Sequence, residues 1–270
     1  MGYLFDPDNW EWLTTGNNLR FLLEGFLVNL EIAAIAIVFS LIFGLLLALA
    51  RLSRLRPLGV AAGVWVDIWR NLPLIFIILY LALALPAPWK DFYESNVPGF
   101  FPEALQSGRV FAGILGLVLY NSAVIAEIMR AGILSLDRGQ GEAAASLGLT
   151  YPQQLRYVIL PQGLRRMVPA TVSQVITLNK DTTLVSIIAI QEVVRHGRIL
   201  SSGFTAFTGG GTQAPLLQVF IFIGALFVVT NFALSRLSRR LEIRERKRTG
   251  GTAGPVMGLE DQTALAAEAS

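Results

Sequence analysis

Long apolar segments without charge are the feature that most constrains how this chain can fold. Residues 32–50, 71–89 and 199–235 contain no Asp, Glu, Lys or Arg. A helix needs about 20 mainly apolar residues to cross the hydrocarbon core of a bilayer. Charged residues make up only 15% of the chain, whereas soluble domains carry ~25%. The chain is therefore predicted to be an all-α polytopic membrane protein.

The apolar segments predict five transmembrane helices. We expect them at residues 21–50, 60–86, 110–133, 167–194 and 216–235. The fourth segment is the least apolar, since it carries Lys180 and Asp181 near its middle. The Gly209–Gly211 run and Pro215 indicate a turn before a last helix that starts near Leu216.

Lys and Arg are distributed unevenly over the segments between these helices. Of the 22 basic residues, 15 fall in alternate segments predicted to lie on one side of the membrane and 5 on the other. Basic loops stay cytoplasmic, so residues 1–20 are expected outside the cell and the C-terminus inside. The basic segment 236–248 is expected to contact anionic lipid. This placement explains the pI of 9.4 better than binding to nucleic acid does. Residues 249–270 are expected to be a disordered cytoplasmic tail.

Several kinds of catalytic and metal chemistry lack their residues in this sequence. There is no Cys, and the single His, His196, cannot build a multi-histidine metal site. No Gly-Lys dipeptide occurs, so the chain has no P-loop for ATP. We therefore predict no catalytic residues, no metal site and no cofactor in this chain. His196 itself is expected to be exposed in an outer loop.

The predicted cytoplasmic segment 131–166 has the pattern of a compact helical elbow. A short helix at residues 140–147 is expected to end at Gly148 in the left-handed conformation. Thr150 and Gln153 have the spacing of a capping box, which starts a second helix. Pro161 and Pro169 are expected to keep that second helix from running straight into the membrane.

Within the elbow, Glu142-Ala143-Ala144 is followed by Gly148 and then by Leu160-Pro161. This spacing resembles the EAA loop of the permease subunits of bacterial ABC importers. Val158 stands where that pattern usually has Ile. The flanking sequences are similar to the polar amino acid branch, the histidine, glutamine and glutamate uptake type. The resemblance covers residues 20–245.

The resemblance implies a function and a set of partners. Residues 21–248 would form a permease domain in the bacterial inner membrane, half of a pathway completed by a second permease, identical or homologous. Residues 139–161 would couple it to a dimer of ATPase subunits that binds ATP and Mg. An extracytoplasmic solute-binding protein would deliver a polar amino acid. The implied coupling residues are Glu142, Ala143, Ala144, Gly148 and Pro161.

Charged and polar residues inside the predicted spans are candidates for the substrate pathway, because such residues are costly there. They are Arg70, Asn71, Glu127, Lys180, Asp181, Thr182 and Thr183. Two interpretations remain open for Lys180 and Asp181: partners on other helices in a buried ion-pair network, or a place along the pathway. Glu127 and Arg130, three residues apart, can pair with each other. The segment from Arg70 to Leu74 resembles the Arg-Gly-Thr-Pro-Leu segment of the family, but Asn71 and Leu72 stand in place of its Gly and Thr.

A secondary transporter or channel that works alone is the alternative function. Such proteins commonly contain an internal repeat, and none is visible in this sequence. The elbow would also have no purpose in a transporter without an ATPase. The sequence therefore favours the ABC permease.

Overall fold

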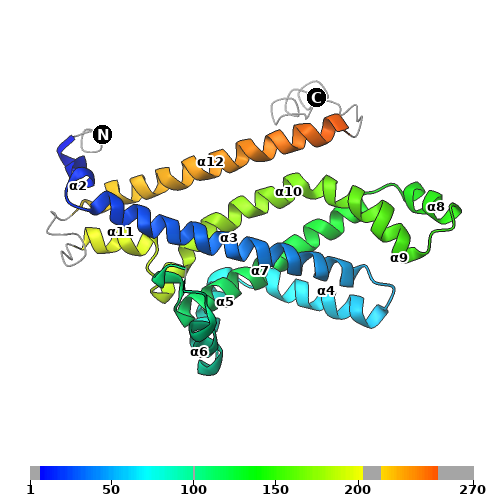
Figure 1. The fold of residues 1–270 in the computed structure, drawn as a ribbon, viewed down its shortest axis with the longest axis horizontal. Helices are drawn as coiled ribbons and strands as arrows, with labels where there is room; N and C mark the ends of the chain where they lie inside the picture. The colour runs from blue at the N-terminus through cyan, green and yellow to red at the C-terminus, as the bar shows by residue number, and fades with distance from the viewer. Residues whose placement is uncertain (1–6, 100, 203–213, 249–270) are drawn as a thin grey trace, which may run out of the picture.

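The computed structural model describes residues 7–99, 101–202 and 214–248, and its regular structure there is entirely helical (Figure 1). The helical elements in chain order are η1 (Pro7–Trp10), α2 (Glu11–Thr14), α3 (Asn18–Arg51), α4 (Arg56–Asn71), α5 (Leu74–Ala84), α6 (Ala87–Asn96), η2 (Glu103–Leu105), α7 (Gly108–Leu134), α8 (Arg138–Ser146), α9 (Tyr151–Gln154), η3 (Leu155–Ile159), α10 (Leu160–Asp181), η4 (Thr182–Ile188), α11 (Val193–Ser201) and α12 (Leu216–Arg248).

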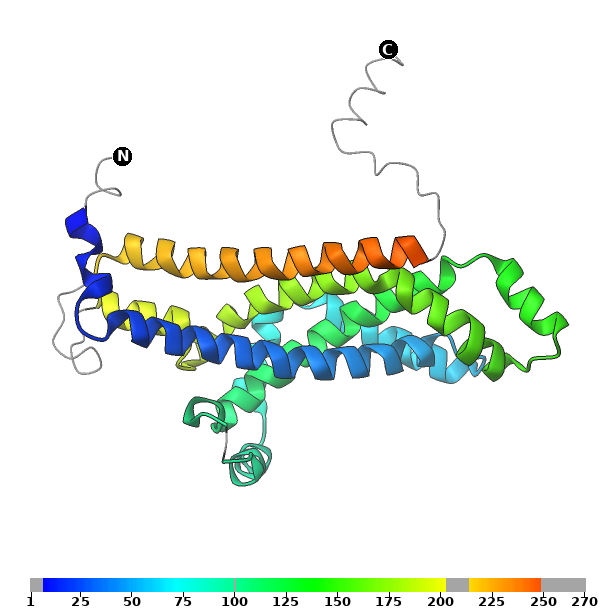
Figure 2. The ribbon, with the colours of Figure 1, turned by 45° about the horizontal axis from the view of Figure 1, so that its top comes forward.

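Helices α3, α7, α10 and α12 run lengthwise along the molecule (Figure 2), with α7 in contact with α3, α4, α5 and α10. Small residues bring α7 close to its neighbours. A Cβ at Gly116 would lie 3.1 Å from the Ile78 side chain, and one at Gly44 would lie 2.7 Å from Ile125. Membrane helices associate through such small residues because apolar side chains gain little by leaving lipid. The contacts of α7 therefore organise the bundle.

Three of the predicted spans have the expected helices. Residues 21–50 lie in α3, residues 110–133 lie in α7, and α12 begins at Leu216 as expected but continues to Arg248. Among the described residues, three helices are long and apolar enough to cross a membrane, or four if the bent pair α4 and α5 counts as one span. The protein is therefore a multi-pass membrane protein.

The prediction of one helix over residues 60–86 was wrong. The segment forms α4 and α5, which meet at an angle of 100° across Leu72 and Pro73. Proline has no N–H to donate and restricts the residue before it to extended conformations, and Leu72 has ψ 137°. The helix therefore ends at Asn71 although the apolar run continues.

The prediction of one helix over residues 167–194 was also wrong, as was the expected effect of the two prolines. Helix α10 includes Pro161 and Pro169, ends at Asp181, and is followed by η4 and α11. The π-helical turn η3, in which the Leu160 N–H bonds the Leu155 carbonyl, connects α9 to α10 without a break. A π-turn adds one residue to the helix locally. The elbow therefore runs continuously into the bundle.

His196 is buried, with 8% of its surface exposed, so the prediction of an exposed loop histidine was wrong. Its ring stacks on Phe21 with centroids 3.8 Å apart, and Nδ1 lies 2.6 Å from the Phe21 carbonyl oxygen. Burial lowers the pKa of the ring because desolvation disfavours its charged form. His196 therefore joins α11 to α3 as a packing residue.

Ala189, at the end of η4, has φ 61°, in the left-handed region. An L-residue costs roughly 1–2 kcal/mol there, and glycine does not. Relief of this strain in Ala189→Gly is expected to raise the free energy of unfolding. The gain is limited to about 1 kcal/mol, because the greater freedom of glycine in the unfolded chain offsets part of it. Thermal unfolding in detergent measures this. Ala170→Gly, inside α10, should instead lower stability by about 1 kcal/mol; a decrease for Ala189→Gly as well would contradict the prediction.

The most basic segments lie toward one end of the molecule. The α3–α4 turn, the elbow α8–α9 and the C-terminal end of α12 share that end, and α2 and α11 lie toward the other (Figures 1 and 2). The expected Gly209–Gly211 turn and the tail 249–270 lie outside the described residues.

Candidate functional site

The first helix of the elbow, α8, has well-defined ends. Asp137 caps its start, with its side chain accepting a hydrogen bond from the Gly139 N–H at 2.8 Å. At its end Gly148 has φ 77°, as predicted. The Gly148 N–H bonds the Ala145 carbonyl at 2.9 Å and the Leu149 N–H bonds the Ala144 carbonyl at 3.2 Å. These are the two hydrogen bonds of a Schellman motif, which fixes the direction of the chain as it leaves the helix.

The second helix of the elbow starts with the predicted capping interaction. The Gln153 side-chain oxygen accepts a hydrogen bond from the Thr150 N–H at 2.8 Å. Two further contacts hold the elbow to the bundle: Gln162 donates to the Gln140 side chain at 3.1 Å, and Arg166 donates to the Ser135 carbonyl at 2.8 Å. The elbow is thus braced on both sides of its bend.

The outer face of the elbow carries most of the predicted coupling residues. Glu142, Ala143, Gly148 and Pro161 are exposed, whereas Ala144 is buried within its own chain, with 3% exposure. Leu147 is 81% exposed, and the sequence analysis did not include it among the coupling residues. Its place in the sequence, an apolar residue at the end of a short capped helix, is the signal that would have identified it. The face combines one carboxylate, small residues and one apolar side chain, which suits docking to another protein.

Glu127 lies in a cluster of charges near the elbow end of the bundle. As predicted, it pairs with Arg130, at 2.6 Å. Its second oxygen also accepts a hydrogen bond from Arg51 at 2.7 Å, which the sequence did not predict. Arg51 comes from the last turn of α3, so the cluster joins two helices. Both carboxylate oxygens of Glu127 are therefore occupied by arginines of the same chain.

Lys180 and Asp181 form no ion pair with any described residue, in contrast to the network expected under one interpretation. Lys180 is exposed at the end of α10 and shares a helix face with the exposed Ser173 and the half-buried Thr177. Thr182 is fully buried and donates to the Asn179 carbonyl at 2.7 Å. The outer face of α10 is therefore a row of exposed and half-buried polar side chains.

Side chains on the two flanks of this row bond α10 to neighbouring helices. The Gln174 side chain donates to Asn121 of α7 at 2.8 Å, and Asn179 donates to Asn231 of α12 at 3.0 Å. The Thr183 hydroxyl donates to the Lys180 carbonyl, so it caps the helix end instead of reaching a neighbour. These contacts give α10 a fixed orientation, with its polar row outward.

Arg70 and Asn71 lie at the break between α4 and α5 and are exposed. The Asn71 side chain donates to the Asp67 carbonyl at 2.7 Å and so closes the last turn of α4. All three of Arg70, Asn71 and Lys180 are candidates for the substrate pathway. In the described part of the chain, however, no hydrogen bond or ion pair joins Arg70 or Asn71 to Lys180.

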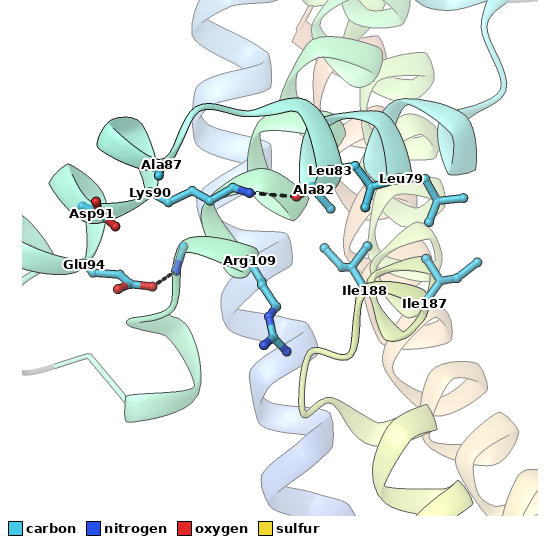
Figure 3. Close-up of a pocket in the computed structure, with 11 residues that line it drawn as sticks. Leu79, Ala82, Leu83, Ala87, Lys90, Asp91, Glu94, Arg109, Ile187 and Ile188 are labelled. Atoms are coloured by element: carbon cyan, nitrogen blue, oxygen red, sulfur yellow. Dashed lines mark hydrogen bonds between the residues drawn. The ribbon is translucent and has the colours of Figure 1, made fainter.

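A pocket of about 460 Å³ lies where α5, α6, the start of α7 and η4 meet (Figure 3). Lys90 donates to the Ala82 carbonyl at 2.8 Å, and Glu94 accepts from the Gly108 N–H at 2.6 Å. These two bonds fasten the short helix α6 to α5 and α7. The exposed Asp91 and Arg109 also line this pocket.

Comparison with known protein families matches residues 40–246 to the binding-protein-dependent transport system inner membrane component family. The chain belongs to this family. It is thus a membrane permease subunit of an ABC importer, in which a separate subunit hydrolyses ATP. The predicted EAA loop corresponds to the elbow α8–α9.

Individual relatives agree over most of the permease. It is 36% identical over 228 residues, 84% of this chain and 95% of the other, to the probable glutamine ABC transporter permease protein GlnP of Bacillus subtilis. It is 31% identical over 234 residues, 87% and 97% of the two chains, to the glutamate/aspartate import permease protein GltK of Escherichia coli. The crystal structure of an amino acid ABC transporter with histidines matches with a TM-score of 0.68 and 28% identity, covering 84% of this chain and 94% of that one.

Proposed function

We propose that this permease imports a polar amino acid. The relatives named for glutamine and for glutamate and aspartate import, and the solved amino acid transporter, support this substrate class. An extracytoplasmic solute-binding protein would deliver the amino acid. The substrate is a zwitterion with a polar side chain, and a polar helix face such as that of α10 can accommodate it.

The elbow is the proposed contact with the ATPase dimer, which would hold ATP and Mg. The observation that carries this proposal is the exposed face of Glu142, Ala143 and Leu147 on a helix closed at both ends. A rigid segment transmits displacement, whereas a flexible one would absorb it. Residues 139–161 are the proposed coupling region. They include Gly148, which follows α8, and Pro161, which lies in the first turn of α10.

The proposed topology has five membrane crossings, with the N-terminus outside and the C-terminus cytoplasmic in the bacterial inner membrane. Besides α3, the bent pair α4 and α5, α7 and α12, the proposed crossing is α10, the fourth in chain order, whose 22 residues span about 33 Å at 1.5 Å per residue. Lys180 on this helix needs shelter from lipid, because a charged side chain is costly in the membrane. A second permease, identical or homologous, would provide it, and the polar row of Ser173, Thr177 and Lys180 would then border the shared pathway together with Arg70, Asn71, Asp181 and Thr183. The basic segment 236–248 would contact anionic lipid.

Reconstitution tests the proposed function. The permease is placed in liposomes with its ATPase and binding protein, with ATP enclosed, and uptake of radiolabelled L-glutamine, L-glutamate, L-arginine and L-histidine is measured. We expect uptake of at least one of these amino acids that depends on both ATP and the ATPase. Uptake by the permease alone, without ATP, would instead establish the secondary transporter or channel.

A further inference from the structure

Tyr151 fastens the elbow to the turn between α3 and α4. The Tyr151 hydroxyl donates a hydrogen bond to the Leu52 carbonyl at 3.2 Å. The guanidinium of Arg54 lies over the same ring, 4.0 Å from its centroid. Tyr151 is the first residue of α9, next to the capping residue Thr150. The ring is thus held at its hydroxyl and on its face by two residues of one turn.

This turn leads directly to the charge cluster of the bundle. Arg51, the residue before Leu52, ends α3 and reaches two other helices. It bonds Glu127 of α7 at 2.7 Å and lies 3.6 Å from Asp67 of α4. Glu127 also binds Arg130, so the contacts run from the elbow through the turn to α3, α4 and α7.

The cluster is shielded enough to hold its geometry. The side chains of Arg51 and Glu127 are only 22% and 23% exposed. Partly buried charge pairs are screened less by water and salt than exposed ones. Since Arg51 and Leu52 are adjacent, a displacement of the α3–α4 turn displaces the arginine that joins the three helices.

We propose that Tyr151, together with Arg54, is a coupling latch that makes the α3–α4 hairpin move with the elbow. This rests on the proposed function, in which the elbow receives its motion from the ATPase. The elbow is covalently continuous with α7 and with α10, and α7 packs against α3 and α4. The Tyr151 contact adds a direct connection at the end of the hairpin that lies next to the elbow. Without the latch, this end of the hairpin is connected to the elbow only through the packing of α7 and α10, so it follows the elbow less completely. ATP is then hydrolysed without complete opening of the pathway.

The test is the number of substrate molecules imported per ATP hydrolysed in liposomes that hold the full complex, measured with whichever of L-glutamine, L-glutamate, L-arginine and L-histidine the wild type imports. Tyr151→Ala is expected to lower this ratio by at least about threefold, within the range that residues along a coupling route can have. Tyr151→Phe keeps the ring over Arg54 and loses only the hydrogen bond, so its ratio should fall between those of Tyr151→Ala and the wild type.

Tyr93 provides a matched control. Its hydroxyl also donates to a backbone carbonyl, that of Leu105, at 2.8 Å, and its ring stacks on Phe111. It fastens α6 rather than the elbow, so Tyr93→Phe removes the same kind of bond and should leave the ratio unchanged. An equal fall for Tyr93→Phe and Tyr151→Phe would assign the effect to general loosening and overturn the latch.

Arg54→Gln tests the other half of the contact. It should lower the ratio, and adding it to Tyr151→Ala should lower the ratio no further, because residues that act through one contact are not additive. If Tyr151→Ala does not assemble, Tyr151→Phe and Arg54→Gln decide. A wild-type ratio in these variants overturns the latch and leaves the proposed function intact. Wild-type uptake that needs no ATP overturns the proposed function itself.

Discussion

Glu142→Lys is expected to lower ATP-dependent uptake by tenfold to a hundredfold while the permease still reaches the membrane. Glu142 is exposed on α8, and its carboxylate has no partner among the described residues. The change therefore disturbs no contact inside the permease. At the proposed joint it removes a carboxylate that would accept a charge-assisted hydrogen bond from the ATPase, a bond that contributes roughly 1.5–3 kcal/mol, and it brings a positive charge against the group that donated this bond. Uptake and substrate-stimulated ATP hydrolysis are measured together.

Two variants show whether the loss belongs to this position. Glu142→Gln keeps a hydrogen-bond acceptor without the charge, so uptake should fall only partly. Glu103→Lys makes the same charge change at an exposed residue in η2, away from the elbow, and should transport normally. Normal uptake with normal stimulated ATP hydrolysis in Glu142→Lys would show that Glu142 is not at the joint.

The elbow could be predicted because its structure depends on neighbours in sequence. The turn at Gly148 and the cap formed by Thr150 and Gln153 need only residues three to five positions apart, and both are present. The break at Pro73 was also visible in the sequence. The uncharged apolar run through residues 71–89 nevertheless favours one continuous helix, because hydropathy alone does not register the bend that Pro73 imposes.

The environment of α10 could not be predicted in the same way. Its bonds join Gln174 to Asn121 and Asn179 to Asn231, pairs separated by 53 and 52 residues. A hydropathy pattern reports only that such a helix is polar, not which side chains find partners. His196 is similar, since its burial depends on Phe21, 175 residues away. The start of α11 did have a local signal in the sequence. Glu192 lies immediately before this helix, and its side chain caps it by accepting hydrogen bonds from the Val194 and Arg195 N–H groups.

Gly148→Val is expected to abolish ATP-dependent uptake through the backbone alone. A Cβ at Gly148 would meet no atom within 4 Å, so the position has room for a side chain. The obstacle is φ 77°, which costs an L-residue roughly 1–2 kcal/mol, and a β-branched one is a clear outlier there. The chain is expected to leave this conformation and break the two hydrogen bonds that close α8. The elbow would then present Glu142 and Leu147 in the wrong direction. Uptake per unit of permease in the membrane measures the effect.

Gly148→Asn separates conformation from size. Asparagine is larger than glycine but adopts the left-handed conformation more readily than other residues. It should therefore keep most of the uptake, with Gly148→Ala between Asn and Val. Gly224→Val makes the same change on α12, where an added Cβ also meets nothing within 4 Å and φ is not positive, and it should transport normally. If Gly148→Asn lost uptake as fully as Gly148→Val, the critical property would be the space in front of Gly148, and the partner surface would have to fit against the glycine itself.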